Sequence, residues 1–335
     1  MKSKIKFGVS LYSYQDEFFR RSMTLEECIQ AVADMGADGI EIIPEEMIRN
    51  FPHLSDEFLD QWFGWMEKYG TKPVAIDAFN DERTIYKHMG KEMPFDEVVA
   101  YHKSYIDVCH KLGCKYIRGM VTDEKVIREL VPYAEEKNVY LGLEVHAPFG
   151  IMSERTQNFL NIKEKIGTKN MGIIPDFGIW EKRGVPVILE QCIRDGAPRA
   201  CVEFADEKRR AGWSWEKMQE WLDQKKASAI ERDAVRRAFC ITQDDPQLLR
   251  QVMPHILGLH GKFWEMTENL EEASADYETA MRILIEEGFD GYINSEYEGG
   301  RHIQDIEEVR GVEQVRRQHA MMRNIIDKIE AEEKD

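Results

Sequence analysis

Two periods of hydrophobic positions alternate along the chain. Short apolar runs, typical of strands buried on both faces, separate longer stretches that have apolar residues at helical spacing. The apolar runs predict strands at residues 6–11, 39–43, 73–77, 115–118, 139–146, 171–176, 255–260 and 291–296. The helical pattern predicts helices near residues 24–35, 55–69, 95–112, 123–137, 154–166, 276–287 and 309–331.

Cap residues mark the ends of these elements. Thr24 and Glu27 have the spacing of a capping box, in which each side chain satisfies a free amide at the start of a helix. Gly36, Gly113 and Gly288 each end a helical stretch just before a strand, and glycine readily adopts the left-handed turn found there. The order of helix, glycine and strand therefore repeats along the chain.

This alternation predicts the α/β class and a closed (β/α)8 barrel, the TIM barrel. A doubly wound open sheet is the alternative, but no GxGxxG motif follows the first strand. We expect a single domain over residues 1–335, with a helical insertion at residues 197–243 between strands six and seven. The insertion contains Trp213, Trp215 and Trp221, and it forms either a surface insertion or a lid or oligomer contact over the barrel mouth.

Composition narrows the classes of partner. The formal net charge is −17, and so acidic a protein repels nucleic acid and anionic membrane surfaces. No segment has the apolar length of a membrane span, and the N-terminal apolar stretch is too short for a signal peptide. The six cysteines form no CxxC pair, so we expect them to be reduced in a cytoplasmic protein. We also expect an oligomer.

Four polar residues lie at the predicted carboxyl ends of strands five to eight: Glu144, Asp176, His260 and Glu296. In a barrel these ends converge on the face that holds active sites, where three carboxylates repel one another without a cation. Mostly hard oxygen ligands suit Mn²⁺, Mg²⁺ or Co²⁺ better than zinc, which prefers more histidine and cysteine. We therefore predict that these four side chains bind one divalent cation, with Mn²⁺ as the preferred metal and Mg²⁺ or Co²⁺ as alternatives.

Side chains two residues apart on a strand point the same way. His146 therefore lies with Glu144, and its imidazole is either a general acid or base or a hydrogen-bond partner of the metal carboxylates. Lys262 follows strand seven, where it either binds substrate or forms an ion pair with Glu298 or Asp176.

Further candidates for substrate binding lie at the mouth. We expect Glu298 and Tyr12 to contact substrate there, and Trp264 either stacks on a sugar ring or an aromatic group or packs in the rim. Weaker candidates lie on strands two to four: Glu41, Asp77 and Arg118. Six other histidines in loops or helical stretches are expected at the surface: His53, His88, His102, His110, His302 and His319.

Four motifs surround the predicted ligands: Leu-Glu-Val-His at 143–146, Ile-Pro-Asp-Phe at 174–177, Leu-His-Gly-Lys-Phe-Trp-Glu at 259–265 and Asn-Ser-Glu-Tyr-Glu-Gly at 294–299. In this barrel order they resemble the xylose isomerase-like superfamily of sugar isomerases and epimerases, over most of the chain outside 197–243. The resemblance implies that the four residues bind one Mn²⁺ or related ion on a sugar. In ketose 3-epimerases of this group the matching glutamates, here Glu144 and Glu296, shuttle the proton.

Three phrases narrow the resemblance: Gly-Val-Ser-Leu-Tyr-Ser at 8–13, Gly-Ile-Glu-Ile-Ile at 39–43 and His-Gly-Lys-Phe-Trp-Glu at 260–265. Together they are similar to the larger subunit of bacterial C-glycoside deglycosidases, which act on 3-oxo C-glucosides with a smaller β-sandwich partner. The resemblance implies a carbon–carbon lyase that removes a proton beside a carbonyl and expels an aglycone protonated by His146. The alternative is a sugar isomerase or ketose 3-epimerase that works through a metal-stabilised enediolate.

Two other classes fit less well. A repair endonuclease of the endonuclease IV kind resembles this barrel but needs several zinc ions and many more histidines, and the charge of −17 opposes DNA binding. A non-catalytic barrel would have no use for an open metal site. The sequence thus favours a small-molecule sugar or glycoside as the substrate.

Overall fold

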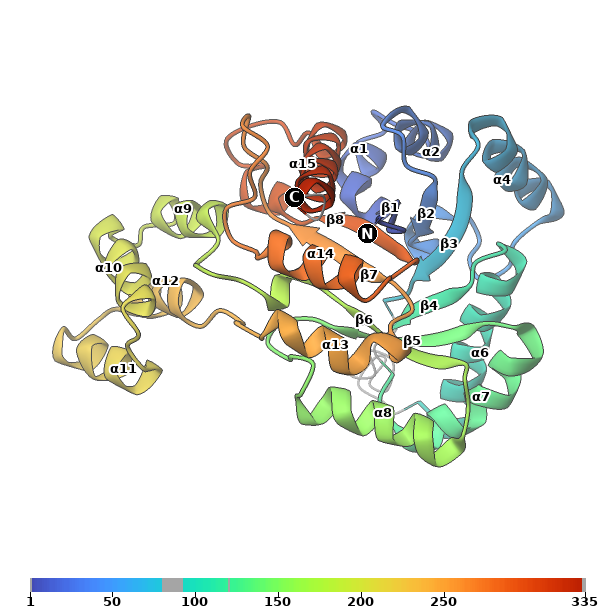
Figure 1. The fold of residues 1–335 in the computed structure, drawn as a ribbon, viewed down its shortest axis with the longest axis horizontal. Helices are drawn as coiled ribbons and strands as arrows, with labels where there is room; N and C mark the ends of the chain where they lie inside the picture. The colour runs from blue at the N-terminus through green and yellow to red at the C-terminus, as the bar shows by residue number, and fades with distance from the viewer. Residues whose placement is uncertain (1, 80–92, 120, 333–335) are drawn as a thin grey trace.

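The computed structural model describes residues 2–79, 93–119 and 121–332, and a barrel of parallel strands forms its centre (Figure 1). The strands lie in the order β6-β5-β4-β3-β2-β1-β8-β7. Two single parallel bridges, Ile173 with Ile256 and Asp176 with His260, close the ring between β6 and β7. The predicted (β/α)8 barrel is confirmed. The strands are β1 (Lys6–Ser10), β2 (Gly39–Ile42), β3 (Lys72–Asp77), β4 (Tyr116–Gly119), β5 (Tyr140–Val145), β6 (Met171–Pro175), β7 (Leu259–Phe263) and β8 (Tyr292–Tyr297).

Helices surround the barrel, and their ends follow the predicted cap residues. The capping box of Thr24 and Glu27 is present, and Gly36, Gly113 and Gly288 have positive φ values of 76°, 74° and 71°. The longer helices are α2 (Leu25–Asp34), α4 (Asp56–Tyr69), α6 (Phe95–Lys111), α7 (Glu124–Lys137), α8 (Glu154–Ile166), α14 (Tyr277–Glu286) and α15 (Gly311–Glu332). Shorter ones are α1 (Gln15–Phe19), α3 (Pro44–Met47) and α13 (Leu249–Val252).

Strand seven differs from the prediction of residues 255–260. Met253–His255 form a short 3-10 helix, and β7 begins only at Leu259. Pro254 has no amide hydrogen to give to a strand ladder, and an apolar run alone does not fix where pairing begins. The predicted boundary is therefore wrong by several residues.

The shifted strand changes the depth of the side chains on it. In the ladder between β7 and β8, His260 lies opposite Asn294, and Lys262 lies opposite Glu296. His260 is thus one side-chain layer deeper in the barrel than Glu296. Lys262 lies level with that carboxylate.

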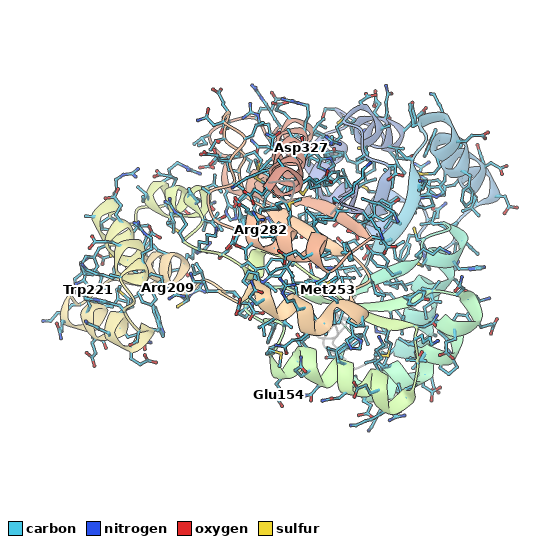
Figure 2. The ribbon with its side chains drawn as sticks, in the orientation of Figure 1. Glu154, Arg209, Trp221, Met253, Arg282 and Asp327 are labelled. Atoms are coloured by element: carbon cyan, nitrogen blue, oxygen red, sulfur yellow. The ribbon has the colours of Figure 1, made fainter. Side chains whose placement is uncertain are left out.

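The insertion forms an arm, residues 186–239, that projects from the side of the barrel (Figure 1). Its helices are α9 (Pro186–Arg194), α10 (Arg199–Arg210), α11 (Trp215–Gln224) and α12 (Ala229–Phe239). The predicted helical insertion is confirmed, although its first helix begins before residue 197. Figure 2 shows Trp221 on the outer part of the arm and Arg209 nearer to the barrel.

The arm has a hydrophobic core of its own. Trp221 stacks on Phe204 with ring centroids 4.5 Å apart, and Trp215 packs against Phe239 at 5.7 Å. These tryptophan contacts lie within the arm, which favours the surface-insertion alternative over a tryptophan lid.

Helix α9 joins the arm to the loop after β8. Arg194 donates a hydrogen bond of 2.6 Å to the carbonyl of His302 and pairs with Asp305 at 2.8 Å. The Gln191 amide oxygen lies 2.6 Å from His302 Nδ1, and the His302 ring lies 5.7 Å from the Trp264 ring. The base of the arm therefore contacts the rim of the barrel.

The prediction of surface histidines is wrong for three of them. His102, His302 and His319 are buried, at 2%, 9% and 0% exposure. His319 lies on α15 with Nε2 2.7 Å from Ser295 Oγ of β8, so it faces the barrel. A lone histidine in a polar helix does not reveal which face packs inward. His53 and His110 are exposed, and His88 lies outside the described residues.

Within the described part of the chain, no helix combines the length and the apolar character that a membrane crossing requires.

Candidate active site

The four side chains predicted to bind metal come together at the mouth end of the barrel. Glu144 lies in β5, Asp176 directly follows β6, and His260 and Glu296 lie in β7 and β8. One ligand atom from each lies within 4.8 Å of the others, and none of the four residues is more than 2% exposed. Three carboxylates and one imidazole gathered this closely have the donor set of a divalent-cation site.

Carboxylates outnumber cations in and around this cluster. Arg118 and Lys262 contact the carboxylates from within the barrel, and Arg301 reaches Glu298 from the rim at 3.6 Å. Buried charge is costly unless it is compensated, so a divalent cation is the group that would offset the excess. The residues present therefore fit the predicted metal. The carboxylates are Glu41, Asp77, Glu144, Asp176, Glu296 and Glu298.

The pKa values of the three ligand carboxyl groups are shifted in different directions. Burial raises the pKa of Asp176 to about 7, even though Lys262 attracts the ionised form. Burial also acts on Glu296, but Lys262 and His260 together outweigh it and lower its pKa to about 2. The pKa of Glu144 is likewise lowered, because the surrounding cations outweigh burial. Without a cation the cluster therefore resists ionising all three carboxyl groups at neutral pH.

Lys262 lies among the ligand carboxylates. Its Nζ is 2.7 Å from Asp176 Oδ2, 3.3 Å from Glu296 Oε2 and 3.5 Å from Glu298 Oε1. Burial alone would lower its pKa, but these carboxylates outweigh burial and raise the pKa, so the ammonium is charged. The ion pairs that the sequence left open are present, and the role of Lys262 in substrate binding stays a prediction.

The weaker substrate candidates on strands two to four lie beneath the ligands. Glu41 and Asp77 are fully buried, and Arg118 is 8% exposed. Arg118 Nη1 lies 3.0 Å from Asp77 Oδ1, and its Nη2 lies 2.5 Å from Glu144 Oε2. Glu41 contacts His260, Arg118 contacts Glu144, and Asp77 contacts Arg118. Such positions suit support of the ligands better than contact with substrate.

His146 lies half-buried above Glu144, with Nε2 3.9 Å from Glu144 Oε2. Its Nδ1 lies 2.6 Å from the carbonyl oxygen of Ala147. A carbonyl only accepts hydrogen bonds, so Nδ1 carries the hydrogen and Nε2 keeps a free lone pair. Burial lowers the pKa of His146, which favours this neutral form. The imidazole can therefore accept a proton beside the cluster.

A pocket of about 380 Å³ opens at the rim, beside the segments that follow β1 and β8. It is lined by two of the predicted substrate-binding residues, Tyr12 and Glu298, and by none of the four clustered residues. The Arg301 guanidinium lies 5.6 Å from the centre of the Tyr12 ring. Pockets of this size hold small organic ligands. Trp264 is not among the residues that line this pocket; it packs against His302 in the rim.

Two further residues at the site, Asn294 and Tyr116, were not predicted from the sequence. Asn294 donates hydrogen bonds to Glu41 at 3.0 Å and to the Tyr116 hydroxyl at 3.1 Å. Asn294 lies two residues before Glu296 on β8, so strand alternation was a signal that could have identified it. Tyr116 lies two residues before Arg118 on β4, so the same alternation could have identified it.

Comparison with known proteins agrees with the fold. A model of the family described as xylose isomerase-like TIM barrel matches residues 29–212. The C-glycoside deglycosidase alpha subunit of Arthrobacter globiformis is 28% identical over 97% of this chain and 93% of its own length. The 3'-dehydrocarminate deglycosidase alpha subunit of a Microbacterium species is 27% identical over 98% of this chain and 97% of its own length.

Solved structures share the fold at low sequence identity. The IOLI protein, crystallised with a zinc atom, has a TM-score of 0.57 and 15% identity, covering 97% of this chain and 99% of its own. D-psicose 3-epimerase, crystallised in the presence of D-fructose, has a TM-score of 0.54 and 12% identity, covering 96% and 99%.

Proposed function

The chain belongs to the xylose isomerase-like TIM barrel family, and on this premise we propose that it is a divalent-metal-dependent enzyme acting on sugars. The proposed reaction is lyase cleavage of the carbon–carbon bond that joins sugar and aglycone in a 3-oxo C-glycoside. The buried cluster of Glu144, Asp176, His260 and Glu296 beneath the His146 imidazole is the observation that supports it. Two relatives named as deglycosidase subunits, which match nearly the whole chain, favour this chemistry.

The four clustered residues would hold Mn²⁺, or Mg²⁺ or Co²⁺ in its place. Such a cation acts as a Lewis acid that polarises the 3-oxo carbonyl and acidifies the hydrogen on the neighbouring carbon. The Lys262 ammonium is charged and lies opposite Glu296 in the ladder. It donates a hydrogen bond to a sugar oxygen. Tyr12 and Glu298, which line the pocket at the rim, bind the glycoside.

His146 moves the proton in the proposed reaction. Its free Nε2 takes the hydrogen from the carbon between the carbonyl and the glycosidic carbon. The electron pair of that C–H bond forms a carbon–carbon double bond, and the bond to the aglycone breaks. The aglycone carbon then takes the proton from His146, so no other reactant is needed.

We propose that a smaller second subunit completes the enzyme. Both deglycosidase relatives are named alpha subunits. A partner of this kind would cover the mouth of the barrel and exclude water from the reacting bond.

An assay in D₂O tests the proposal. The chain, alone and co-expressed with a small protein encoded beside its gene, is supplied with a 3-oxo C-glucoside and with free ketoses. Each reaction is run with Mn²⁺ or with EDTA and analysed by mass spectrometry. Metal-dependent release of the aglycone is expected. Aglycone release that persists in EDTA would contradict the metal site.

His146→Gln is the variant that isolates the proton transfer. It is expected to lower kcat by about 100-fold or more, the usual contribution of a general acid–base group, and to keep Mn²⁺ bound. His110→Gln is the matched control, because His110 is exposed and its Nδ1 also lies against a carbonyl, that of Lys137, at 2.9 Å. Equal activity in both variants would remove His146 from the mechanism.

The second candidate is a sugar isomerase or ketose 3-epimerase. The observation in its favour is that carboxylates of Glu144 and Glu296 enter the cluster from separate strands, as a proton-shuttling pair requires. The low pKa of Glu296 suits a ligand better than a base. Deuterium incorporation into a free ketose without aglycone release would favour this candidate.

A further inference from the structure

A chain of buried polar side chains crosses the barrel beneath the metal cluster. Glu41 of β2 is fully buried, and its Oε1 lies 2.9 Å from His260 Nε2. Asn294 Nδ2 donates to the other oxygen of Glu41 at 3.0 Å and to the Tyr116 hydroxyl at 3.1 Å. The network therefore links β2, β4, β7 and β8.

The two ring nitrogens of His260 face different partners. Nδ1 lies 2.9 Å from Glu144 Oε1 and 3.1 Å from Glu296 Oε2, inside the metal cluster. Nε2 faces Glu41, on the opposite side of the ring. Both nitrogens lie beside carboxylates, and Nδ1 is the one that faces the carboxylates proposed to hold the cation. A cation bound at Nδ1 leaves the ring hydrogen on Nε2, where Glu41 Oε1 is the neighbouring acceptor.

Glycines make room for this network. A Cβ on Gly8, which pairs with Asn294 across β1 and β8, would lie 2.2 Å from Asn294 Oδ1. A Cβ on Gly258 would lie 2.2 Å from the Tyr116 hydroxyl. A bare backbone at both positions is what allows Asn294 and Tyr116 to occupy these places. The interior is thus shaped around polar groups that apolar packing alone would exclude.

We propose that Glu41 is a positioning residue that fixes the ring orientation and tautomer of His260 so that Nδ1 faces the cation. The inference rests on the proposed metal-dependent function. Histidine ligands usually donate their second N–H to a carboxylate, carbonyl or water, and loss of such a partner typically weakens metal binding 10- to 100-fold. Glu41 acts through His260 and does not touch the substrate.

Isothermal titration of the EDTA-treated full chain with Mn²⁺ tests the proposal. Glu41→Gln is expected to raise the Kd for Mn²⁺ by about 10- to 100-fold. Asp206→Asn is the control, because it removes a buried carboxylate of the arm that pairs with Arg210, away from the cluster. Its Kd is expected to change by less than about threefold, since it leaves the partner of the ligand in place. The melting temperature of each metal-free variant shows whether it is folded.

A double variant separates orientation from simple loss of charge. In Glu41→Gln/Asn294→Asp, the glutamine amide can donate to the new carboxylate while its oxygen accepts from His260 Nε2, so the network is rebuilt with donor and acceptor exchanged. It is expected to recover most of the lost affinity and the visible spectrum of bound Co²⁺. If Glu41→Gln does not fold, Glu41→Asp takes its place in the test. Its side chain keeps the charge but is one methylene shorter, and it is expected to weaken Mn²⁺ binding.

The outcomes distinguish the two proposals. If the wild-type chain binds no Mn²⁺, the proposed function and this inference both fail. If the wild type binds Mn²⁺ and Glu41→Gln binds it with an affinity no different from that of Asp206→Asn, only the role of Glu41 is refuted.

Discussion

Ion pairs are buried in the barrel interior but exposed in the arm. In the barrel, Lys262 pairs with Asp176 where the two side chains are 12% and 0% exposed. In the arm, Arg232 pairs with Asp223 where the side chains are 41% and 71% exposed. Residues 186–239 contain eleven Lys and Arg and ten Asp and Glu, a net charge of +1, so the rest of the chain carries −18. The acidity of the protein therefore belongs to the barrel.

The difference shows which interactions hold each region. The arm depends on apolar packing of residues such as Met218, Leu222 and Val235, which are no more than 1% exposed. Its exposed ion pairs contribute about 0–1 kcal/mol each. In the barrel the buried charges depend on one another, and removing one leaves its partners uncompensated. A substitution should therefore spread through the site but stay local in the arm.

The largest effect is expected from Asp176→Asn. Loss of one ligand carboxylate should abolish Mn²⁺ binding and lower kcat/KM by about 1,000-fold or more, as loss of a group acting in a unit does. Asp223→Asn in the arm is the control, and its kcat/KM is expected to equal that of the wild type. Full activity of Asp176→Asn would contradict the expectation that loss of a buried charge in the barrel is more damaging than loss of an exposed charge in the arm.

Asp176→Asn is expected to abolish metal binding but not to lower the stability of the metal-free fold. The pKa of Asp176 is raised to about 7, so its ionisation lowers stability as pH rises from the unfolded value toward 7. At pH 8 in EDTA, the neutral Asn avoids this cost, and the melting temperature of Asp176→Asn should equal or exceed that of the wild type. A clear decrease would show that the ion pair with Lys262 outweighs burial.

Leu222→Ala should destabilise the arm by about 2–4 kcal/mol, because it leaves a cavity at a residue 1% exposed. Hydrogen exchange in α10 to α12 should accelerate, while exchange in the barrel strands and the Kd for Mn²⁺ stay unchanged. Weaker Mn²⁺ binding in this variant would show that the arm is coupled to the site.

Acid should weaken the barrel before the arm. Burial lowers the pKa of His102 to about 4, and burial with the charge of Arg323 lowers that of His319 to about 3. Their contribution to stability is complete above the unfolded pKa near 6.5 and is lost as pH falls below it. Residues 186–239 contain no histidine.

Urea unfolding at pH 7.5 and pH 4.5 measures this effect. Each of the two histidines should account for about 2 kcal/mol of the lost stability. His319→Gln should therefore lose less stability than the wild type over this interval. An unchanged loss would mean that carboxyl groups, not His319, determine the acid sensitivity.

The smallest effect is expected from Arg232→Gln, which breaks the ion pair with Asp223 at 2.8 Å. Both side chains are exposed, so the free energy of unfolding should change by less than about 1 kcal/mol. A larger loss would show that hydrogen bonds from Arg232 to the carbonyls of Ala227 and Leu222 hold the arm together.

The sequence was informative where a local pattern controls the structure. Thr24 and Glu27 form their capping box because both partners lie within one turn. Helix α8 has the predicted bounds, 154–166, because Ser153 caps its start and Gly167 ends it. The four clustered residues could be named in advance because each lies at or near a strand end, and parallel strands in a barrel bring these ends together.

Pairing between distant strands decided the rest. The start of β7 depends on the ladder with β8, which an apolar run does not specify. The burial of His319 depends on the face that α15 packs against β8.

By itself, the sequence determined the strand and helix order, the barrel and the chemical nature of the site, because these follow from local periodicity and residue type. Only the tertiary structure decided that Glu41 faces His260 Nε2 and that Lys262 lies among the ligands. Closure of the barrel sets these contacts, since it alone brings together side chains that lie far apart in the chain.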